Sequence, residues 1–231
     1  MHPLNHPVGA RMIAGGAYPL RRSVIQVTPL LEIRRKTAVK LSYKIFGEGT
    51  AEPDVPPVII LHSLLGSKNR WDGLGKTILN ITKRAVIAVD LRNHGTSPHV
   101  NSHKYEELSS DVVRLYDRMG IKRASIVAHG MGGRTAMYLS LTNVRAYFTV
   151  YTFTPHNELP QLEKSIKDDA LMNIVLANVL MKEDGKIGWA CNLDICLKHF
   201  EHIVSFPNNV RTKKFYGPTF FVGGQWSDFL P

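Results

Sequence analysis

Short, almost wholly apolar runs alternate along this chain with longer amphipathic segments. Strands that are buried on both faces of a sheet have this composition, and such burial is typical of parallel sheets covered by helices. Four runs of this kind, each flanked by turn residues, lie at 57–61, 85–89, 124–128 and 146–150. A fifth segment, at 39–46, alternates apolar and polar residues, which predicts an antiparallel edge strand.

The segments between these runs predict helices. Residues 71–81, 105–119 and 134–141 have the length and spacing of crossover helices, and Gly120 follows the second as a helix stop. Because strand and helix alternate, the sequence predicts one α/β domain over 39–231, with a mostly parallel sheet and helices on both faces. The chain has 231 residues, 44% of them hydrophobic, as an ordinary globular domain does.

The alternation of short apolar runs with amphipathic segments ends after Pro155. Residues 161–182 and 193–205 carry long helical patterns, and the turn signal Glu183-Asp-Gly-Lys separates them. A further buried strand is predicted at 217–222. We therefore expect a helical cap, inserted at about 156–210 between two strands, over the carboxyl edge of the sheet.

Positive charge is concentrated at the start of the chain. The net charge is +10, and the first forty residues contribute 7 − 1 = +6 of it. The basic residues there are Arg11, Arg21, Arg22, Arg34, Arg35, Lys36 and Lys40, against the single acid Glu32. This composition predicts a transit peptide over 1–38 and a location in the mitochondrial matrix. A solvated basic tail is the alternative, and a nucleic-acid arm is disfavoured because interleaved aromatic residues are missing.

The chain contains two cysteines, Cys191 and Cys196. Their number excludes a disulfide-stapled scaffold, and they lack the paired CxxC motifs of a structural zinc site, so we interpret them as small buried hydrophobic residues. We predict no metal and no cofactor. No apolar run approaches the roughly 20 residues of a membrane-spanning helix, so no transmembrane segment is expected.

The third apolar run leads into a segment that resembles a nucleophile elbow. The apolar run at 124–128 leads into His129-Gly-Met-Gly-Gly133 and then into a helix. The strained strand-to-helix turn of G-x-S-x-G needs small residues two positions before and two after its apex. Ala128 and Gly132 meet that need. Gly130 stands at the apex, where a serine hydroxyl would be the nucleophile.

A second loop is placed to complete this site. Residues 62–67 follow the first buried run, and we expect the backbone N–H groups of Leu64 and Met131 to form an oxyanion hole. Ser63 is disfavoured as a substitute nucleophile, because no histidine is placed to deprotonate it. The sequence therefore predicts the elbow turn and the oxyanion hole, but it has no side chain at the apex to act as the nucleophile.

Other polar residues near these loops have structural interpretations. His62 and His129 are expected to be packed and hydrogen-bonded. His199 and His202 lie three apart, which places them on one solvated helix face. Residues 92–95 are expected to form hydrogen bonds that fix their loop.

These motifs together resemble mitochondrial serine hydrolases, classed with the lipases, of the α/β-hydrolase superfamily. The residues that carry the resemblance are His62-Ser-Leu-Leu-Gly-Ser67, Val89-Asp-Leu-Arg-Asn-His-Gly-Thr-Ser-Pro98, His129-Gly-Met-Gly-Gly133, Asp184-Gly185, Asn192-Leu-Asp194 and Gly217-Pro-Thr-Phe-Phe-Val-Gly-Gly224.

The resemblance implies an α/β-hydrolase fold that, in this sequence, stops before the last strand and helix. The family has serine where this chain has Gly130, glycine where it has Ser63, and its catalytic acid at the position of Asp194. Related esterases place an aspartate just after the strand at 146–150, where this chain has Tyr-Thr-Phe. The family's histidine belongs to a Gly-His pair beyond the end of this sequence.

Loss of both nucleophile and base predicts impaired or absent ester hydrolysis. The expected role is then binding of an acyl-type small molecule or of a protein. By resemblance, the 2-oxoglutarate dehydrogenase complex is a candidate partner in mitochondria. One alternative is an active carboxylic-ester or acylglycerol hydrolase with an unrecognised nucleophile. Another is a basic-tail protein that binds anionic lipid or nucleic acid, although nucleic acid is not expected.

Overall fold

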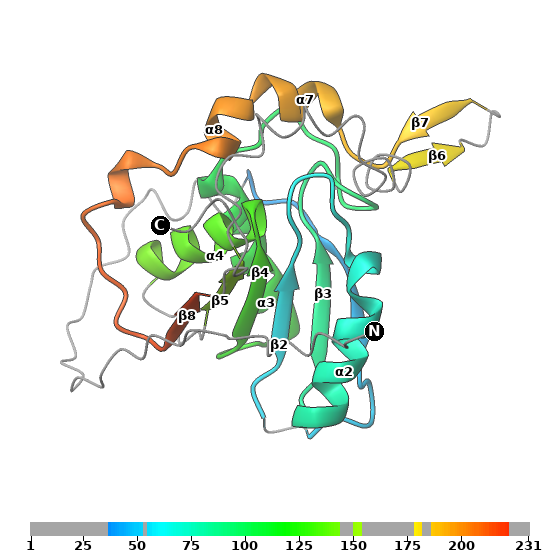
Figure 1. Cartoon of the computed structure of the whole chain (residues 1–231), viewed down its shortest axis with the longest axis vertical. Coiled ribbons are helices and arrows are strands. Elements are labelled where there is room, and N and C mark those ends of the chain that lie inside the picture. The colour runs from blue at the N-terminus through cyan, green and yellow to red at the C-terminus, as the bar shows by residue number, and fades with distance from the viewer. Residues whose placement is uncertain (1–36, 53–54, 144–149, 154–177, 182–185, 222–231) are drawn as a thin grey trace, which may run out of the picture.

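A six-stranded sheet forms the centre of the molecule (Figure 1). The computed structural model describes residues 37–52, 55–143, 150–153, 178–181 and 186–221. The strand order is β1-β3-β2-β4-β5-β8, with β1 antiparallel to β3 and the other pairs parallel. The strands are β1 (Ser42–Phe46), β2 (Val58–Leu61), β3 (Val86–Asp90), β4 (Ser125–His129), β5 (Val150–Phe153) and β8 (Thr219–Phe221). The predicted fold class is confirmed.

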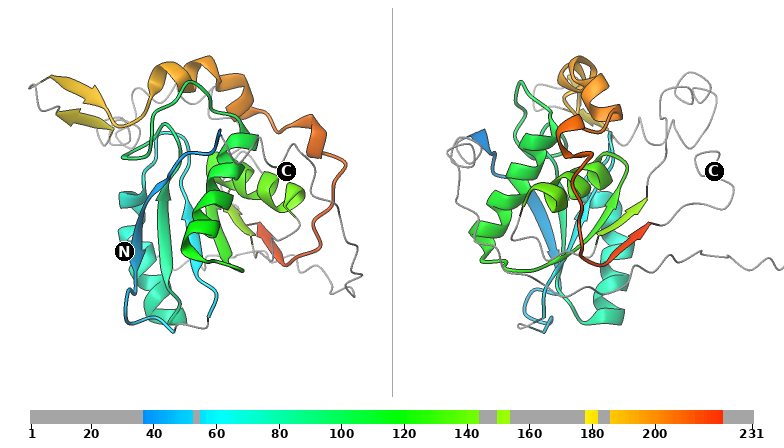
Figure 2. Two further views of the ribbon diagram at one scale, coloured as in Figure 1. Left: turned by 180° about the vertical axis from the view of Figure 1, so that it is seen from behind. Right: turned by 90° about the vertical axis from the view of Figure 1, so that its left-hand side faces the viewer.

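Helices cover both faces of this sheet, as Figure 2 shows in its right-hand view. On one face lies α2 (Asp72–Thr82), preceded by the 3-10 turn η1 (Lys68–Trp71). On the other face lie α3 (Tyr105–Met119) and α4 (Met131–Thr142). Gly120 ends α3 with a φ of 66°, and its N–H donates to the carbonyls of Tyr116 and Asp117, so the predicted helix stop is confirmed.

Alternation along the strands separates two apolar cores. Ile59 and Leu61 of β2 belong to the core shared with α3 and α4, while Val58 and Ile60 face the α2 side. All four side chains are buried. A strand that is buried on both faces needs apolar residues at every position, which explains the unbroken apolar runs in the sequence.

The cap differs from the predicted pair of long helices. Residues 179–181, expected at the end of the first helix, form β6 (Val179–Met181), which pairs antiparallel with β7 (Ile187–Trp189). This hairpin projects away from the sheet in Figure 1. An Asp-Gly pair between short apolar runs is a strong hairpin signal, so Asp184-Gly185 is compatible with a hairpin as well as with the predicted break between helices. The remainder of that predicted helix, at 161–177, lies outside the described residues.

The second predicted cap helix, at 193–205, is two helices. These are α7 (Leu193–Lys198) and α8 (Phe200–Val204), which lie beyond the carboxyl ends of the strands and are followed by η2 (Asn208–Val210). Side chains of the sheet-covering helices fix α8 separately from α7: the hydroxyl of Tyr105 and the guanidinium of Arg134 both donate to the carbonyl of Ile203.

The strand expected at 146–150 overlaps β5 at Val150, and its other residues lie outside the described part of the chain. β5 begins at Val150 and includes the Tyr-Thr-Phe segment that was expected to follow the strand. Residues 144–149 lie outside the described residues, as does the basic segment at 1–36. Among the residues that the structure describes, no helix has the length and apolar character needed to cross a bilayer.

Candidate functional site

The turn between β4 and α4 has the backbone of a nucleophile elbow. Gly130 caps the helix with φ 49° and ψ −115°, a conformation that L-residues rarely adopt. The turn is buried, and Ala128 on the strand side is fully buried. His129 ends β4 and is half-buried. The glycine at the apex therefore keeps the shape of the turn without carrying a reactive side chain.

Close backbone contact between α4 and the end of β2 requires Gly132. A Cβ atom at this position would stand 2.6 Å from the carbonyl oxygens of both Leu61 and His62. This approach brings the start of α4 against the loop that follows β2. It explains, in terms of sterics, why the position two residues after the apex has to be small.

Gly132→Ala is expected to destabilise the protein by about 1–3 kcal/mol, because the new methyl group meets main-chain atoms that cannot rotate away. Gly73→Ala in α2 is the matched control, since nothing lies within 4 Å of its Cβ position. The control should raise stability by up to about 1 kcal/mol through helix propensity. Urea unfolding of both variants measures the contrast, and equal effects of the two substitutions would contradict the close approach.

The two expected oxyanion donors flank this contact. Met131 is the first residue of α4 and is buried, so its N–H belongs to the helix's first turn, where N–H groups have no intrahelical acceptor. Leu64 lies half-buried in the loop after β2 and packs against the core of the α3 and α4 face. A helix N-terminus beside this loop provides positive potential for a carbonyl oxygen or a carboxylate.

His62 is a structural residue of that loop. Its Nδ1 lies 2.7 Å from the carbonyl oxygen of Ser63, and its Nε2 accepts the N–H of Leu91 at 2.9 Å. Ser63 and Gly66 close the loop as a turn with a 3.0 Å backbone hydrogen bond. Burial lowers the pKa of His62, so the imidazole is neutral. The expected packed, hydrogen-bonded role of His62 is confirmed.

Two further histidines line the same region. The ring of His94 lies 5.0 Å from that of His62 and 5.5 Å from that of His103, centroid to centroid. Nε2 of His103 stands 3.1 Å from the sulfur of Met131, next to the elbow apex. Burial, with a smaller contribution from the positive charge of Arg92, lowers the pKa of His103 to about 3. A histidine with that pKa is a poor general base near neutrality.

The loop after β3 is fixed by hydrogen bonds, as predicted for residues 92–95, and those of Arg92 also form a buried ion pair. The guanidinium of Arg92 donates to both carboxylate oxygens of Asp111 in α3, at 2.6 and 2.8 Å, and these side chains are buried. Asn93 adopts φ 65° and accepts the N–H of Val100 at 2.7 Å. The structure therefore confirms a positioning role for this loop.

Asp90 at the end of β3 is a second anchor. Its carboxylate accepts the backbone N–H of Lys68 at 2.7 Å and the N–H of Thr96 at 3.0 Å, and it pairs with the Lys68 ammonium. Burial on its own would raise the pKa of Asp90, but these hydrogen bonds outweigh burial and lower the pKa. The carboxylate thus holds the two loops at the carboxyl edge together.

Asp194, the expected acid, differs from the elbow in its exposure to solvent. It is exposed in the first turn of α7, whereas Gly130 and Met131 are buried. The cap of that helix is Asn192, whose side-chain oxygen accepts the N–H of Ile195 at 3.4 Å. The expectation that His199 and His202 share one solvated helix face is wrong for His199. His199 caps the junction of α7 and α8 and is half-buried, whereas His202 is exposed in α8, with the two ring centroids 5.9 Å apart.

Comparison with known proteins identifies the family to which this architecture belongs. Residues 56–169 match the family model described as alpha/beta hydrolase fold. The sn-1-specific diacylglycerol lipase ABHD11 of Danio rerio is 30% identical over 232 residues, covering 86% of this chain and 71% of that protein. The chain belongs to the α/β-hydrolase family.

Two other proteins are similar to this α/β hydrolase. A probable alcohol acetyltransferase of Cyberlindnera jadinii is 28% identical over 257 residues, which cover 87% of this chain and 72% of that protein. A solved marine microorganism esterase superposes with a TM-score of 0.65 at 24% identity and covers 80% of each chain. The esterase shows the fold, and it shares the arrangement of a sheet covered by helices on both faces.

One feature of this α/β hydrolase could not be expected from its sequence. His94, Cys191 and Cys196 come together, although the histidine lies in the loop after β3 and the cysteines lie in the cap. The spacing between the two cysteines did not indicate a metal site, because the third residue of the cluster, His94, lies far away in the sequence. The Asn-His-Gly segment at 93–95 is part of a motif shared with α/β hydrolases and predicts loop-fixing hydrogen bonds, but it carries no metal-site pattern.

Proposed function

We propose that this α/β hydrolase binds an acyl-type ligand at the elbow without forming a covalent acyl intermediate there. The observation that carries the proposal is glycine at the apex of an intact elbow: Gly130 has the backbone conformation of the elbow turn but no side chain, and so no hydroxyl. The classes of chemistry named for the relatives, diacylglycerol lipase and alcohol acetyltransferase, share an acyl ester.

The local electrostatics support acyl binding over hydrolysis. A carbonyl or carboxylate oxygen at the start of α4 would meet the first-turn N–H groups and the positive end of the helix. Its surroundings are neutral imidazoles, since burial lowers the pKa of each of His62, His94 and His103. Within the described residues, these three rings already have hydrogen-bond partners, so proton transfer would first break those bonds.

Two measurements on one purified sample test this function. A serine-directed fluorophosphonate probe is expected to leave the protein unlabelled, and p-nitrophenyl acyl esters are expected to turn over no faster than they do in buffer. A fatty acid or a non-hydrolysable acyl ether should bind with saturation. Covalent labelling together with ester turnover would establish the active-hydrolase alternative.

Gly130→Ser is expected to cost stability without creating activity. An L-residue held at φ 49° and ψ −115° carries strain of about 1–3 kcal/mol, so the midpoint of chemical unfolding should fall. The new hydroxyl should stay unlabelled by fluorophosphonate, because neutral, hydrogen-bonded histidines surround the elbow. Gly73→Ser, at the open position in α2, is the control and should leave the midpoint nearly unchanged. Rapid labelling of the serine variant would contradict this prediction, because it would require a side chain that deprotonates the new hydroxyl.

We further propose import into mitochondria, supported by the seven basic residues and one acid in the first forty residues. A fluorescent protein fused behind residues 1–40 should co-localise with a matrix marker. The matched control replaces Arg11, Arg21 and Arg22 with glutamine, which should leave the fusion in the cytosol. A diffuse signal from the unmodified fusion would refute the import proposal.

A further inference from the structure

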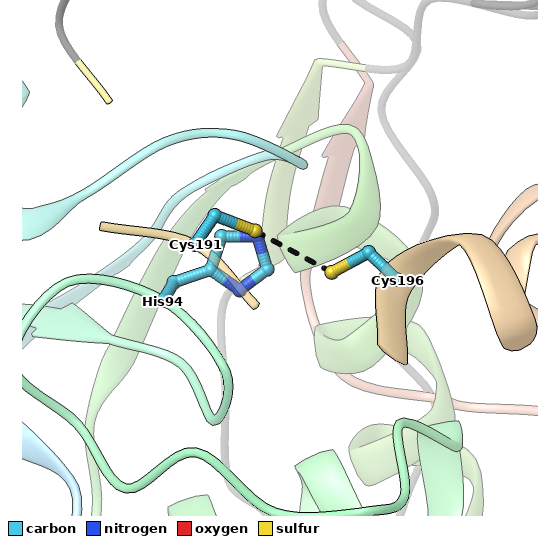
Figure 3. Close-up of side chains that lie close together, drawn as sticks. All are labelled: His94, Cys191 and Cys196. Atoms are coloured by element: carbon cyan, nitrogen blue, oxygen red, sulfur yellow. Dashed lines mark hydrogen bonds between the residues drawn. The ribbon is translucent and has the colours of Figure 1, made fainter. Parts of the chain in front are cut away.

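Three side chains that favour metal ions meet where the cap lies over the sheet. His94 comes from the loop after β3, Cys191 from the segment that enters α7, and Cys196 from α7 itself (Figure 3). The two sulfur atoms are 3.4 Å apart, and one ligand atom from each of the three residues lies within 4.8 Å of the others. All three residues are buried, with exposed fractions of 0%, 2% and 4%.

Backbone contacts hold these residues in place. His94 and Cys191 form an antiparallel β-bridge, and the N–H of Asn192 donates to the carbonyl of Asn93 at 2.8 Å. The N–H of Cys196 donates to the carbonyl of Asn192 at 3.0 Å, so the second cysteine is fixed relative to the first. The cluster therefore follows from main-chain geometry rather than from the rotamers of long, flexible side chains.

The imidazole presents a lone pair to the cluster. Nδ1 of His94 lies 3.0 Å from the carbonyl oxygen of Arg92, which fixes the proton on Nδ1 and leaves the lone pair on Nε2. Metal-binding histidines usually donate the other ring N–H to a carbonyl in this way. The N–H of Leu65 also points at Nε2, at the long distance of 3.3 Å, and a metal ion would replace that weak contact.

We propose that His94, Cys191 and Cys196 bind one zinc ion, which joins the cap to the loop after β3. Tetrahedral zinc with Zn–S bonds of about 2.3 Å places two sulfurs about 3.8 Å apart, close to the separation found here. Two thiolates and a neutral imidazole give the loaded site a net charge of zero, which suits its burial. The fourth position is left for water or an anionic ligand.

Zinc has to displace the protons of both thiols, because only thiolates bind the metal. Burial, together with the neighbouring His62, keeps the pKa of His94 well below its usual value, so the imidazole needs no deprotonation. The hydrogen bond between the two sulfurs lowers the pKa of Cys196 and, together with burial, raises the pKa of Cys191, so both thiols ionise together only when a cation binds between them. As the two Zn–S bonds form, the remaining thiol protons pass to solvent, so zinc binding should acidify a weakly buffered solution.

Metal analysis of the full chain, purified under reducing conditions, tests the site independently of any ligand at the elbow. We expect one zinc per chain and, after exchange with cobalt, a thiolate-to-cobalt charge-transfer band. Since Cys191 and Cys196 are the only cysteines, that band reports on this cluster alone. Cys191→Ser and Cys196→Ser should each weaken zinc binding more than about 100-fold, since even outer-shell losses cost 10–100-fold.

His202→Gln is the matched control, because this histidine is exposed on α8 and lies outside the cluster. It should keep the stoichiometry and the cobalt band. Three results would overturn the proposal: a reduced wild-type chain that takes up no zinc at micromolar concentrations, serine variants that bind zinc as the wild type does, or a cobalt complex without thiolate charge transfer. A Cys191–Cys196 disulfide that persists in reductant would also exclude the site.

Discussion

Arg92→Met is expected to destabilise the protein by about 3–5 kcal/mol, among the largest effects of any single substitution in the described residues. Arg92 is 2% exposed and Asp111 is fully buried, and Arg92 supplies two of the hydrogen bonds to that carboxylate. Burial raises the pKa of Asp111 and the guanidinium opposes that rise. Without Arg92 the carboxyl group would have to take up a proton or remain a buried, unpaired charge.

The exposed ion pair between Lys44 and Asp72 offers the matched control. Its atoms lie 2.7 Å apart, but both side chains are 42% exposed, so Lys44→Met should cost less than about 1 kcal/mol. The double variant Arg92→Met with Asp111→Leu should recover much of the loss, because it removes the unpaired charge as well. Guanidinium unfolding at pH 7 measures all three variants. A small effect of Arg92→Met alone would show that the carboxyl group is not confined as described.

The second large effect is a loss of folding stability at acidic pH. We expect the free energy of unfolding to fall steeply as pH drops below about 6.5, the ordinary pKa of histidine. His62, His94 and His103 are buried with lowered pKa values, so the unfolded chain takes up protons that the folded chain excludes. Their stabilising contribution is complete above pH 6.5 and is lost as pH falls toward the folded-state values. For His103, with a pKa of about 3, the loss at pH 5 is about 2 kcal/mol, and the other two add in the same direction.

Urea unfolding at a series of pH values between 5 and 7.5 measures this dependence. His103→Gln should flatten the curve by the share of one histidine, because glutamine does not titrate. His202→Gln is again the control, and its curve should parallel that of the unchanged chain, since His202 is exposed. A stability that stays constant from pH 7.5 to 5 would mean that the three buried rings become protonated without cost.

Sequence patterns captured the sheet well because burial on both faces imposes a visible composition. Residues 57–61 and 85–89 were expected as strands and form β2 and β3 with ends shifted by one residue. The helix at 105–119 has the predicted bounds, since a strong apolar stripe precedes a glycine stop. The elbow could be predicted equally well, because its tight turn requires small residues at Ala128 and Gly132.

The cap was harder to predict because its elements are short and take their shape from tertiary contacts. A three-residue strand such as β6 is stabilised by pairing with β7, which no local propensity encodes. The separation of α8 from α7 depends on side chains of α3 and α4 that reach the carbonyl of Ile203. The meeting of His94 with the two cysteines likewise depends on a bridge between distant segments.

The glycine at the tip of the elbow has a consequence for how this sequence can change over time. At φ 49° glycine is relaxed, whereas any L-residue is penalised, so purifying selection for a well-folded chain would retain glycine there. Serine would persist only while its chemistry contributes to fitness. Once that advantage is lost, random drift and the gain in folding stability both favour glycine. A later point mutation back to serine is then disfavoured.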